Sequence, residues 1–415
     1  MRISKKILVP FLIFITAFAL RISAVILTPQ NAPDSEGYIK LAVNISEHGM
    51  FSLDGKNPSD HRAPLFPAII ALNHKIFGPS FEHYTLITNA LLDSCSTLLT
   101  YALTLTLSNN PFTAACAAAI YTIHPELLGS NIFILSETPS VFFLLLSFFL
   151  LVLAIKKEKK ILFILSAICM TAEALCRPAI LLFPFFVIFV IPFARKKKIL
   201  ITGTILFLIF FMLTLSPWTI RNYKQFGKFI PVSSNFGESL WAGSMQNWNG
   251  KYNPEIMQIR SNAGHKVNYK GKGYYLVDNY LKKEAMQRIT KDPAGYIILC
   301  LKKAIYFWTG LPGAEEVLKR KPLLAILFRI FHYSLIVLAI VGLIQTTKNQ
   351  IRNPIYLPLL CIIYYTLIHS ALMALPRYRI PILPFVIFYA AHGITQTLSY
   401  YTTLMPAKHH GQNTH

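Results

Sequence analysis

Long apolar runs separated by short polar and basic segments dominate this chain. The first run, Ile7 to Leu27, is too long for a signal-peptide core and lacks a small-residue cleavage site, so we expect it to remain as a membrane anchor. Nine further runs approach or reach spanning length, at 84–107, 112–129, 131–155, 161–176, 178–194, 199–216, 324–345, 354–371 and 380–399. The pattern predicts an all-α polytopic membrane protein with roughly ten transmembrane helices.

Composition supports this class. The 415 residues are 54% hydrophobic and only 14% charged, whereas soluble domains contain about 25% charged residues. The formal net charge is +22, but lysine and arginine fall in short clusters between apolar runs, which favours a bilayer over nucleic acid as the partner. The six cysteines show no CxxC spacing and indicate neither a disulfide framework nor a zinc site.

Positive charge in the short loops predicts orientation. The N-terminus, 156–160, 195–198, 348–352 and Lys408 fall on one side if each run crosses once, and this side is cytoplasmic by the positive-inside rule. Both termini are then cytoplasmic in an inner (plasma) membrane protein. The opposite, extracytoplasmic side receives the polar segments 28–83, 124–131, 176–178, 217–323 and 374–381.

Four regions follow from this topology. The N-terminal transmembrane module is 1–216 and includes the first outer loop, 28–83. Residues 217–323 have a soluble composition and form a small extracytoplasmic cap, in which Tyr296 to Leu311 is expected as a helix on the membrane surface. C-terminal transmembrane helices occupy 324–400, and the tail 401–415 is cytoplasmic, with disorder expected from Lys408.

The first outer loop carries the most informative polar cluster. Ser35 to His48 has apolar residues at helical spacing and ends before Gly49, which predicts an amphipathic helix that begins beside Asp34 and Glu36. Capping of this helix is the simpler role for the two carboxylates. It does not explain their convergence with His61 and Arg62, whereas a reaction between an anionic donor and a hydroxyl or amine acceptor would use all four.

The absence of several common motifs limits the classes of reaction that this site could perform. The chain has no GxxxxGK[ST] loop, no GxGxxG after a strand and no HExxH, which argues against an ATP-driven pump, a nucleotide-sugar enzyme and metal-dependent hydrolysis. A lipid phosphate fits the outer face, because phosphate leaves as a stable anion without a general acid. One carboxylate base and a few cations then suffice. No cofactor is required, and a divalent ion at Asp34 and Glu36 is the less favoured alternative.

Six short sequence motifs, distributed over most of the chain, point to one family. Together they resemble the bacterial branch of the dolichyl-phosphate-mannose protein mannosyltransferase family, whose members are GT-C fold glycosyltransferases related to the aminoarabinose transferase of lipid A. The strings are Asp34-Ser-Glu-Gly-Tyr38, Arg62-Ala-Pro-Leu-Phe-Pro67, Leu135-Ser-Glu-Thr138, Cys176-Arg-Pro178, Ser216-Pro-Trp-Thr-Ile-Arg-Asn-Tyr223 and Arg377-Tyr-Arg-Ile-Pro381.

The resemblance implies inverting transfer of a sugar from a polyprenyl-phosphate donor to an extracytoplasmic acceptor. Asp34 matches the family's catalytic acidic residue, and Tyr38 matches an aromatic residue lining the phosphate and sugar site. Arg62 corresponds to a basic residue that contacts the donor phosphate. The late outer loop, with Arg377, Tyr378 and Arg379, adds basic groups near the lipid phosphate.

One departure concerns the two carboxylates. Ser35 separates Asp34 from Glu36, whereas the eukaryotic enzymes have an adjacent acidic pair, so the division of roles between these two candidate catalytic residues stays open; we favour Asp34 as base.

Each of three further residues has two possible roles. Glu137 binds acceptor or sugar, or pairs with Arg177 or Arg221. Arg177 binds phosphate or anchors the membrane interface, and Arg221 contacts the donor phosphate or forms an interfacial pair with Trp218. The acidic residues Asp93 and Glu173 are expected to form hydrogen bonds between helices.

Two other functions remain at this stage. A flippase or transporter of lipid-linked sugars would use the same charges along a path, although transporters place polar groups near the membrane midplane. A polymerase or ligase of lipid-linked glycans would release a lipid diphosphate. The sequence identifies neither the sugar nor the acceptor, which is a glycolipid, a glycan or a protein.

Overall fold

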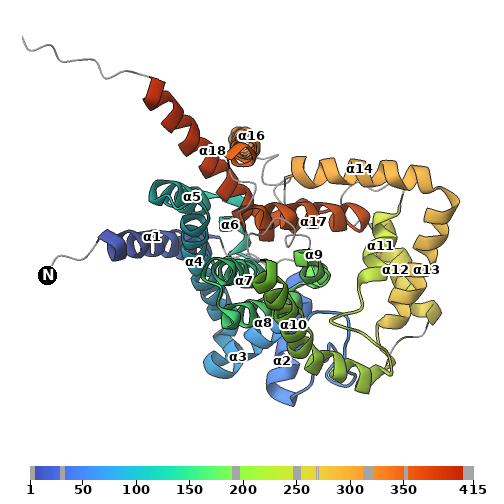
Figure 1. Cartoon of the computed structure of the whole chain (residues 1–415). Coiled ribbons are helices and arrows are strands. Elements are labelled where there is room, and N and C mark those ends of the chain that lie inside the picture. The colour runs from blue at the N-terminus through green and yellow to red at the C-terminus, as the bar shows by residue number, and fades with distance from the viewer. Residues whose placement is uncertain are drawn as a thin grey trace, which may run out of the picture.

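The computed structural model describes residues 5–28, 33–188, 197–245, 254–267, 269, 271–311, 321–349 and 354–404. Within these residues the chain is helical, and the extended pairing is confined to one β-bridge between Ser52 and Pro58. The helices up to residue 226 and those from residue 322 onward form a bundle, and the helices between residues 236 and 309 gather beside it (Figure 1).

Seven stretches of the described chain are long and apolar enough to cross a membrane, which confirms the polytopic all-α class. They lie in α1 (Lys5–Leu27), in α3 (Leu65–Phe77) continued by the 3₁₀ turn η1 (Gly78–Ser80) and α4 (Phe81–Ser108), in α7 (Glu137–Lys157), in α10 (Lys197–Phe226), in α16 (Pro322–Asn349), in η4 (Pro354–Tyr356) with α17 (Leu357–Ala371), and in η5 (Pro376–Ile382) with α18 (Leu383–Leu404).

Within the described residues, two of the expected apolar runs do not form one continuous helix, because proline breaks them. The run 112–129 divides into α5 (Pro111–Ile123) and α6 (Pro125–Ser130), since Pro125 cannot donate the backbone hydrogen bond that would continue the helix. The run 178–194 contains the 3₁₀ turn η2 (Pro178–Ile180) and the short α9 (Phe183–Phe186), and its end lies outside the described residues. Residues 161–176 form the 17-residue α8 (Lys160–Cys176).

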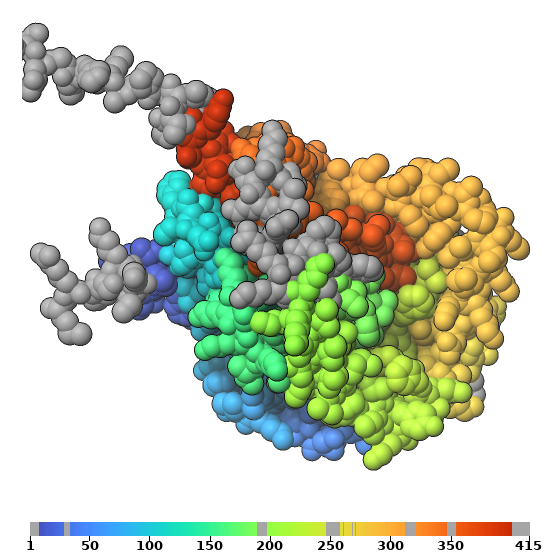
Figure 2. Space-filling model, viewed as in Figure 1, coloured from blue at the N-terminus to red at the C-terminus, as the bar shows by residue number. Residues whose placement is uncertain are grey.

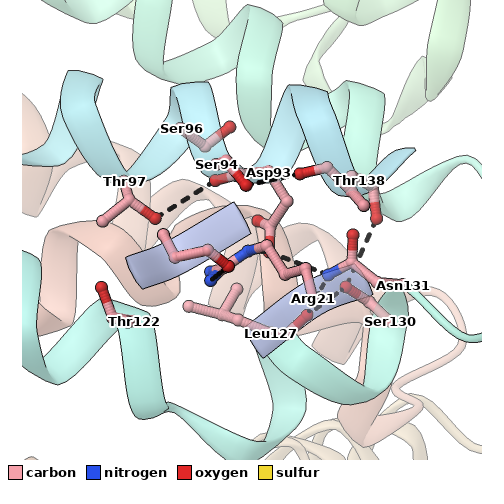
Figure 3. A network of polar contacts seen from close by, with 12 residues as sticks. Arg21, Asp93, Ser94, Ser96, Thr97, Thr122, Leu127, Ser130, Asn131 and Thr138 are labelled. Atoms are coloured by element: carbon pink, nitrogen blue, oxygen red, sulfur yellow. Dashed lines mark hydrogen bonds and ion pairs between the residues drawn. The ribbon is translucent and has the colours of Figure 1, made fainter. Parts of the chain in front are cut away.

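Buried polar bonds tie the membrane helices together. Asp93 of α4 accepts hydrogen bonds from Arg21 Nε of α1 at 2.5 Å and from Asn131 at 2.8 Å (Figure 3). It also accepts one from the Tyr121 hydroxyl of α5 at 2.5 Å. The buried Glu173 of α8 accepts from the Ser140 hydroxyl of α7 at 2.8 Å. Both acidic residues therefore join helices, as the sequence predicted, and the Asp93 network fixes the largely lipid-exposed α1 to the bundle.

Close backbone contact joins the last two long helices. A Cβ atom on Gly342 of α16 would collide with the carbonyl oxygen of Tyr389 in α18, and one on Gly393 would crowd the backbone of α16. Glycine at both positions lets the helices approach closely, as in other membrane helix pairs.

The predicted amphipathic helix of the first outer loop is α2 (Pro33–His48). It ends at Gly49, whose φ of 66° belongs to the left-handed region that favours glycine. The chain then returns through residues 49–64 to α3, a helix that the sequence analysis did not separate from the loop.

Where the structure describes the segment 217–323, it contains four further helices, α11 (Phe236–Gly243), α12 (Pro254–Val267), α13 (Tyr275–Lys291) and α14 (Pro293–Thr309). They gather on one side of the molecule, away from the N-terminal end of α1 and the C-terminal end of α18 (Figures 1 and 2). The expected helix near 296–311 is α14, and its location on the membrane surface stays a prediction.

One predicted domain boundary lies within a helix, and parts of the predicted cytoplasmic segments are not described by the structure. The boundary expected at 216 falls inside α10, which continues through Pro217 to Phe226. Part of the tail, residues 405–415, lies outside the described residues. The same is true of parts of two basic clusters, residues 195–196 and 350–352.

Candidate functional site

A cavity of about 390 Å³ lies where the first outer loop meets the ends of several membrane helices. Its polar side is formed by the start of α2, the residues before α3, the first residue of α7 and the start of η5. Residues 231–235, between α10 and α11, and residues 236–239, in the first turn of α11, form another wall. Seven of the eleven site residues expected from the sequence line this cavity, namely Asp34, Tyr38, Arg62, Glu137, Arg177, Arg377 and Tyr378.

Five charged side chains in the cavity form a row of alternating sign. Arg62 Nη2 lies 2.9 Å from Asp34 Oδ1, and Arg377 Nη2 lies 2.5 Å from Asp34 Oδ2. Arg377 Nε is 3.9 Å from Glu137 Oε1, which is 2.9 Å from Arg177 Nη1. The row therefore has an arginine at each end and a third between the two carboxylates.

Asp34 lies inside the first turn of α2, and both of its carboxylate oxygens contact guanidinium groups. Burial alone would raise its pKa, but Arg377 and Arg62 hold the pKa of this carboxyl well below its usual range. Asp34 is therefore ionised at neutral pH. Its contacts are those of a site residue and go beyond the capping role considered from the sequence.

Glu137 is nearly inaccessible and stands at the N-terminus of α7, where the helix dipole also favours a negative charge. Its ion pair with Arg177 matches one of the two readings from the sequence. Arg177 follows α8, and its guanidinium lies over the Tyr378 ring at 5.2 Å from the centroid.

Two tyrosines hold the arginines in place. The Arg62 guanidinium lies 5.0 Å from the centroid of the Tyr38 ring, and the Tyr38 hydroxyl is 3.2 Å from the Ser136 hydroxyl. Tyr378 lies beneath Arg177 and, at 5.6 Å, Arg377. Such cation–π contacts restrict the guanidiniums without neutralising their charge.

Glu36 does not enter the cavity. Its side chain is 72% exposed and forms an ion pair with Lys40 one turn later, at 2.6 Å. Two residues along an α-helix turn the direction of the side chain by about 200°, so Asp34 and Glu36 point to opposite sides of α2.

Arg379 is also outside the cavity, fully buried among α6, α14 and η5. Its guanidinium binds both oxygens of Glu126, at 2.5 and 3.1 Å. This geometry leaves Arg379 no route to a donor phosphate.

His61 and Arg221 lie behind the cavity wall. His61 Nε2 is 3.5 Å from Glu238 of α11, and its ring lies 4.1 Å from that of Tyr274. Arg221 donates to the carbonyl oxygen of Ser59 at 2.9 Å and lies 4.8 Å from the Trp218 ring. Both residues fix the segment that precedes Arg62.

The sequence analysis missed several residues of the site. Cys176, Ala179, Leu181, Leu182, Tyr364 and Ile368 form an apolar wall of the cavity, and Ser233, Asn235 and Ser239 form a polar wall. Apart from Cys176, which lies in the string Cys176-Arg-Pro178, they belong to segments without a distinctive spacing. The one available signal was the helical spacing of Tyr364 and Ile368, which are four residues apart on α17.

In the described part of the chain, no three histidine, cysteine or acidic side chains come together as a group that could hold a metal ion. The two carboxylates of the cavity instead contact guanidinium groups. Metal independence stays a prediction.

Known structures share this fold. The oligosaccharyltransferase AglB from Archaeoglobus fulgidus, in complex with an inhibitory peptide and a dolichol-phosphate, matches 95% of this chain with a TM-score of 0.58 and 15% sequence identity. The Archaeoglobus fulgidus oligosaccharyltransferase tethered to an acceptor peptide matches 96% with a TM-score of 0.59 and 15% identity. This chain spans about half of these proteins, 51% in both cases.

ArnT from Cupriavidus metallidurans bound to undecaprenyl phosphate is also similar, with 10% identity and a TM-score of 0.46 over 95% of this chain and 79% of ArnT. No curated protein sequence matches the chain.

The protein is thus an all-α GT-C fold membrane protein. Residues 63–263, just under half of the chain, match the model of the dolichyl-phosphate-mannose-protein mannosyltransferase family, in agreement with the resemblance of its motifs. The matched segment contains Glu137 and Arg177 but begins one residue after Arg62, so it does not cover Asp34 or Arg377.

Proposed function

We propose that this protein is a membrane glycosyltransferase that moves a sugar from a polyprenyl-phosphate donor to a hydroxyl or amine acceptor on the extracytoplasmic face. The observation that carries the proposal is the row of alternating charges around Asp34 in a cavity of about 390 Å³. The family match and the GT-C fold support the same class of reaction.

The charge of the cavity suits a lipid monophosphate. Arg62, Arg177 and Arg377 supply three positive charges, and Asp34 and Glu137 supply two negative charges, so the charged lining has a net charge of +1. A sugar linked through one phosphate carries one negative charge and neutralises this excess. A diphosphate-linked glycan would leave an uncompensated charge in a partly buried site, which disfavours the polymerase or ligase alternative.

The walls of the cavity suggest an orientation for the donor. The apolar side chains of Leu181, Leu182 and Ile368 suit the first isoprene units, and the arginine row suits the phosphate. The sugar and the acceptor would then face the polar wall of Ser233, Asn235 and Ser239. AglB binds a dolichol-phosphate, which is consistent with a lipid phosphate at such a site.

In the proposed reaction, Asp34 accepts the proton of the acceptor group as the acceptor attacks the anomeric carbon of the sugar from the side opposite the phosphate. The bond between the anomeric carbon and the phosphate oxygen breaks, and its electron pair stays on the phosphate. The products are the inverted glycoside, the polyprenyl phosphate and protonated Asp34. Because guanidiniums stabilise the leaving phosphate, no general acid or cofactor is needed.

The side of the membrane rests on the positive-inside rule. The basic cluster 156–160 ends α7 at Lys157, whereas Glu137, at the other end of this span, lines the cavity. This arrangement supports our proposal that the cavity and the cap lie on the extracytoplasmic side of the inner membrane.

Transfer tests the proposal directly. Purified protein in sealed liposomes is incubated with polyprenyl-phosphate sugars carrying a labelled saccharide and with envelope glycolipids, glycans or proteins as acceptors, and products are analysed by mass spectrometry. We expect a new glycoside and free polyprenyl phosphate with the wild type, and at most about a hundredth of either product with Asp34→Asn in the same time. Movement of label across the membrane without a new glycoside would instead identify a flippase.

A further inference from the structure

Arg377 occupies the centre of the charge row and faces both carboxylates. Its Nη2 binds Asp34 Oδ2 at 2.5 Å, while its Nε lies 3.9 Å from Glu137 Oε1, beyond hydrogen-bond distance. The Nε atom is buried and, within the described residues, has no hydrogen-bond partner. The Nε–H group of Arg377 is therefore available to form a hydrogen bond with a ligand in the cavity.

The ion pair with Arg377 also limits Asp34 as a base. Asp34 has one oxygen on Arg62 and the other on Arg377, and both bonds are charge-assisted. Two guanidiniums hold the pKa of Asp34 well below its usual range, although burial opposes this. A carboxylate so bound is a weak acceptor for the proton of a hydroxyl or amine.

A phosphate in the cavity would compete for these guanidiniums. Its two unesterified oxygens present more acceptor sites than the single Asp34 oxygen that Arg377 holds, and they can bind Arg377 and Arg177 together. The Glu137 carboxylate lies 3.9 Å from Arg377 Nε, so it can continue to balance the charge of the guanidinium when the donor phosphate draws this group from the base.

We propose that Arg377 couples the two substrates: it holds the base Asp34 in an inactive ion pair until the donor phosphate binds its guanidinium, so the acceptor is deprotonated only after the donor has bound. This inference rests on the proposed function and adds an order to it. The donor binds first. Arg377 then releases Asp34 Oδ2, and this oxygen can accept the proton of the acceptor group.

The chemical reactivity of the carboxyl group tests the ion pair without knowledge of the sugar. The full-length protein in nanodiscs is treated with a water-soluble carbodiimide and an amine, and labelling of Asp34 and of the exposed Glu36 is compared by mass spectrometry. Carbodiimides react with protonated carboxyl groups, and each unit of lowered pKa reduces that form tenfold. In the lipid-free wild type we expect Asp34 to be labelled at least about tenfold more slowly than Glu36.

Two changes should release Asp34. Undecaprenyl phosphate, used as the lipid probe, and the variant Arg377→Gln should each raise the ratio of Asp34 to Glu36 labelling several-fold. Arg329→Gln, a matched change at an exposed position of α16, should leave the ratio unchanged. Because Arg377→Gln is measured without lipid, shielding of Asp34 by the lipid does not affect that result.

Affinity gives a second measurement. If Asp34 and phosphate compete for Arg377, Asp34→Asn should bind undecaprenyl phosphate more tightly than the wild type does, by about tenfold for one lost charge-assisted contact of about 1.4 kcal/mol. Unchanged or weaker binding by Asp34→Asn, or Asp34 labelled as fast as Glu36 in the lipid-free wild type, would overturn the inference.

The lipid measurements separate the two proposals. Binding of undecaprenyl phosphate to the wild type, with Asp34 still unreactive both there and in Arg377→Gln, overturns the coupling role of Arg377 and leaves the proposed function intact. Absence of binding to the wild type overturns the proposed donor class and this inference with it.

Discussion

The guanidinium of Arg379 forms a fully buried, two-point ion pair with the carboxylate of Glu126, with Nη2 2.5 Å from Oε1 and Nε 3.1 Å from Oε2. Its Nη1 donates to the carbonyl oxygen of Phe307 in α14 at 2.6 Å. These bonds fix η5 to α6 and α14. Because η5 also carries Arg377 and Tyr378, the pair positions two cavity residues without entering the cavity.

Glu126→Gln should destabilise the protein strongly. It leaves the Arg379 guanidinium buried without a countercharge, and breaking one side of a buried pair typically costs about 3–5 kcal/mol. Thermal unfolding in detergent measures the loss. Glu36→Gln, which removes an exposed pair with Lys40, is the control and should unfold at nearly the wild-type temperature. Equal unfolding temperatures for the two variants would contradict the role of the Glu126 pair.

The same control serves a catalytic comparison. Asp34→Asn should lower transfer by about 10²- to 10⁴-fold, the usual contribution of a general base, because an amide cannot accept the acceptor proton. Glu36→Gln should retain nearly full activity, since its side chain points away from the cavity. The measurement is the initial rate of glycoside formation in nanodiscs at saturating donor. A severe loss in Glu36→Gln together with an active Asp34→Asn would reverse the assignment of the base.

The sequence could predict the parts of this site that depend on local pattern. Apolar runs revealed the membrane helices, and helical spacing up to Gly49 revealed α2, because both signals lie within one element. The divergence of Asp34 and Glu36 was also accessible, since two residues on a predicted helix point to opposite sides.

The separation of Arg377 from Arg379 was not accessible. In a 3₁₀ helix two residues differ by about 240° in direction, so one of them must leave the cavity, but the sequence does not show which. That choice is made by Glu126, a residue 253 positions away in the chain from Arg379. Tertiary partners at such separation leave no local pattern.

Asp60 illustrates the same limit and leads to a test. Its buried carboxylate accepts hydrogen bonds from the backbone N–H groups of Tyr274 and Tyr275 at 2.6 and 2.9 Å and from the Ser234 hydroxyl at 2.8 Å. The first outer loop thereby caps α13, a helix more than two hundred residues later. The bond also anchors the chain two residues before Arg62.

Asp60→Ala should lower stability by about 1–3 kcal/mol, because it leaves buried N–H groups at the start of α13 without an acceptor. It should also weaken undecaprenyl phosphate binding, since Arg62 loses its anchor. Asp54→Ala is the matched control in the same loop, where Asp54 only forms a local turn with Lys56 and Asn57. Unfolding temperature and lipid affinity are measured for both variants. If the two variants lose stability and affinity equally, Asp60 has no special role.

Lys303 of α14 joins two helix ends on the other side of the cap. Its ammonium is fully buried and donates to the carbonyl oxygens of Gly243, at the end of α11, and of Leu372, just after α17, both at 2.7 Å. A cation is favourable at helix C-termini. Burial nevertheless lowers the pKa of Lys303 to about 8.

This shift sets the sign of a pH effect on stability. The folded protein releases the Lys303 proton near pH 8 and the unfolded chain near 10.5, so between these values the unfolded state binds more protons and the free energy of unfolding rises with pH. The contribution has an upper bound of about 3 kcal/mol across this window. Lys303→Met should abolish that rise, whereas Lys302→Met, at the exposed neighbouring position, should retain it. Unfolding temperatures in detergent from pH 7 to 10, taken relative to the wild type, measure the difference, and parallel curves for the wild type and Lys303→Met would show that Lys303 does not titrate on unfolding.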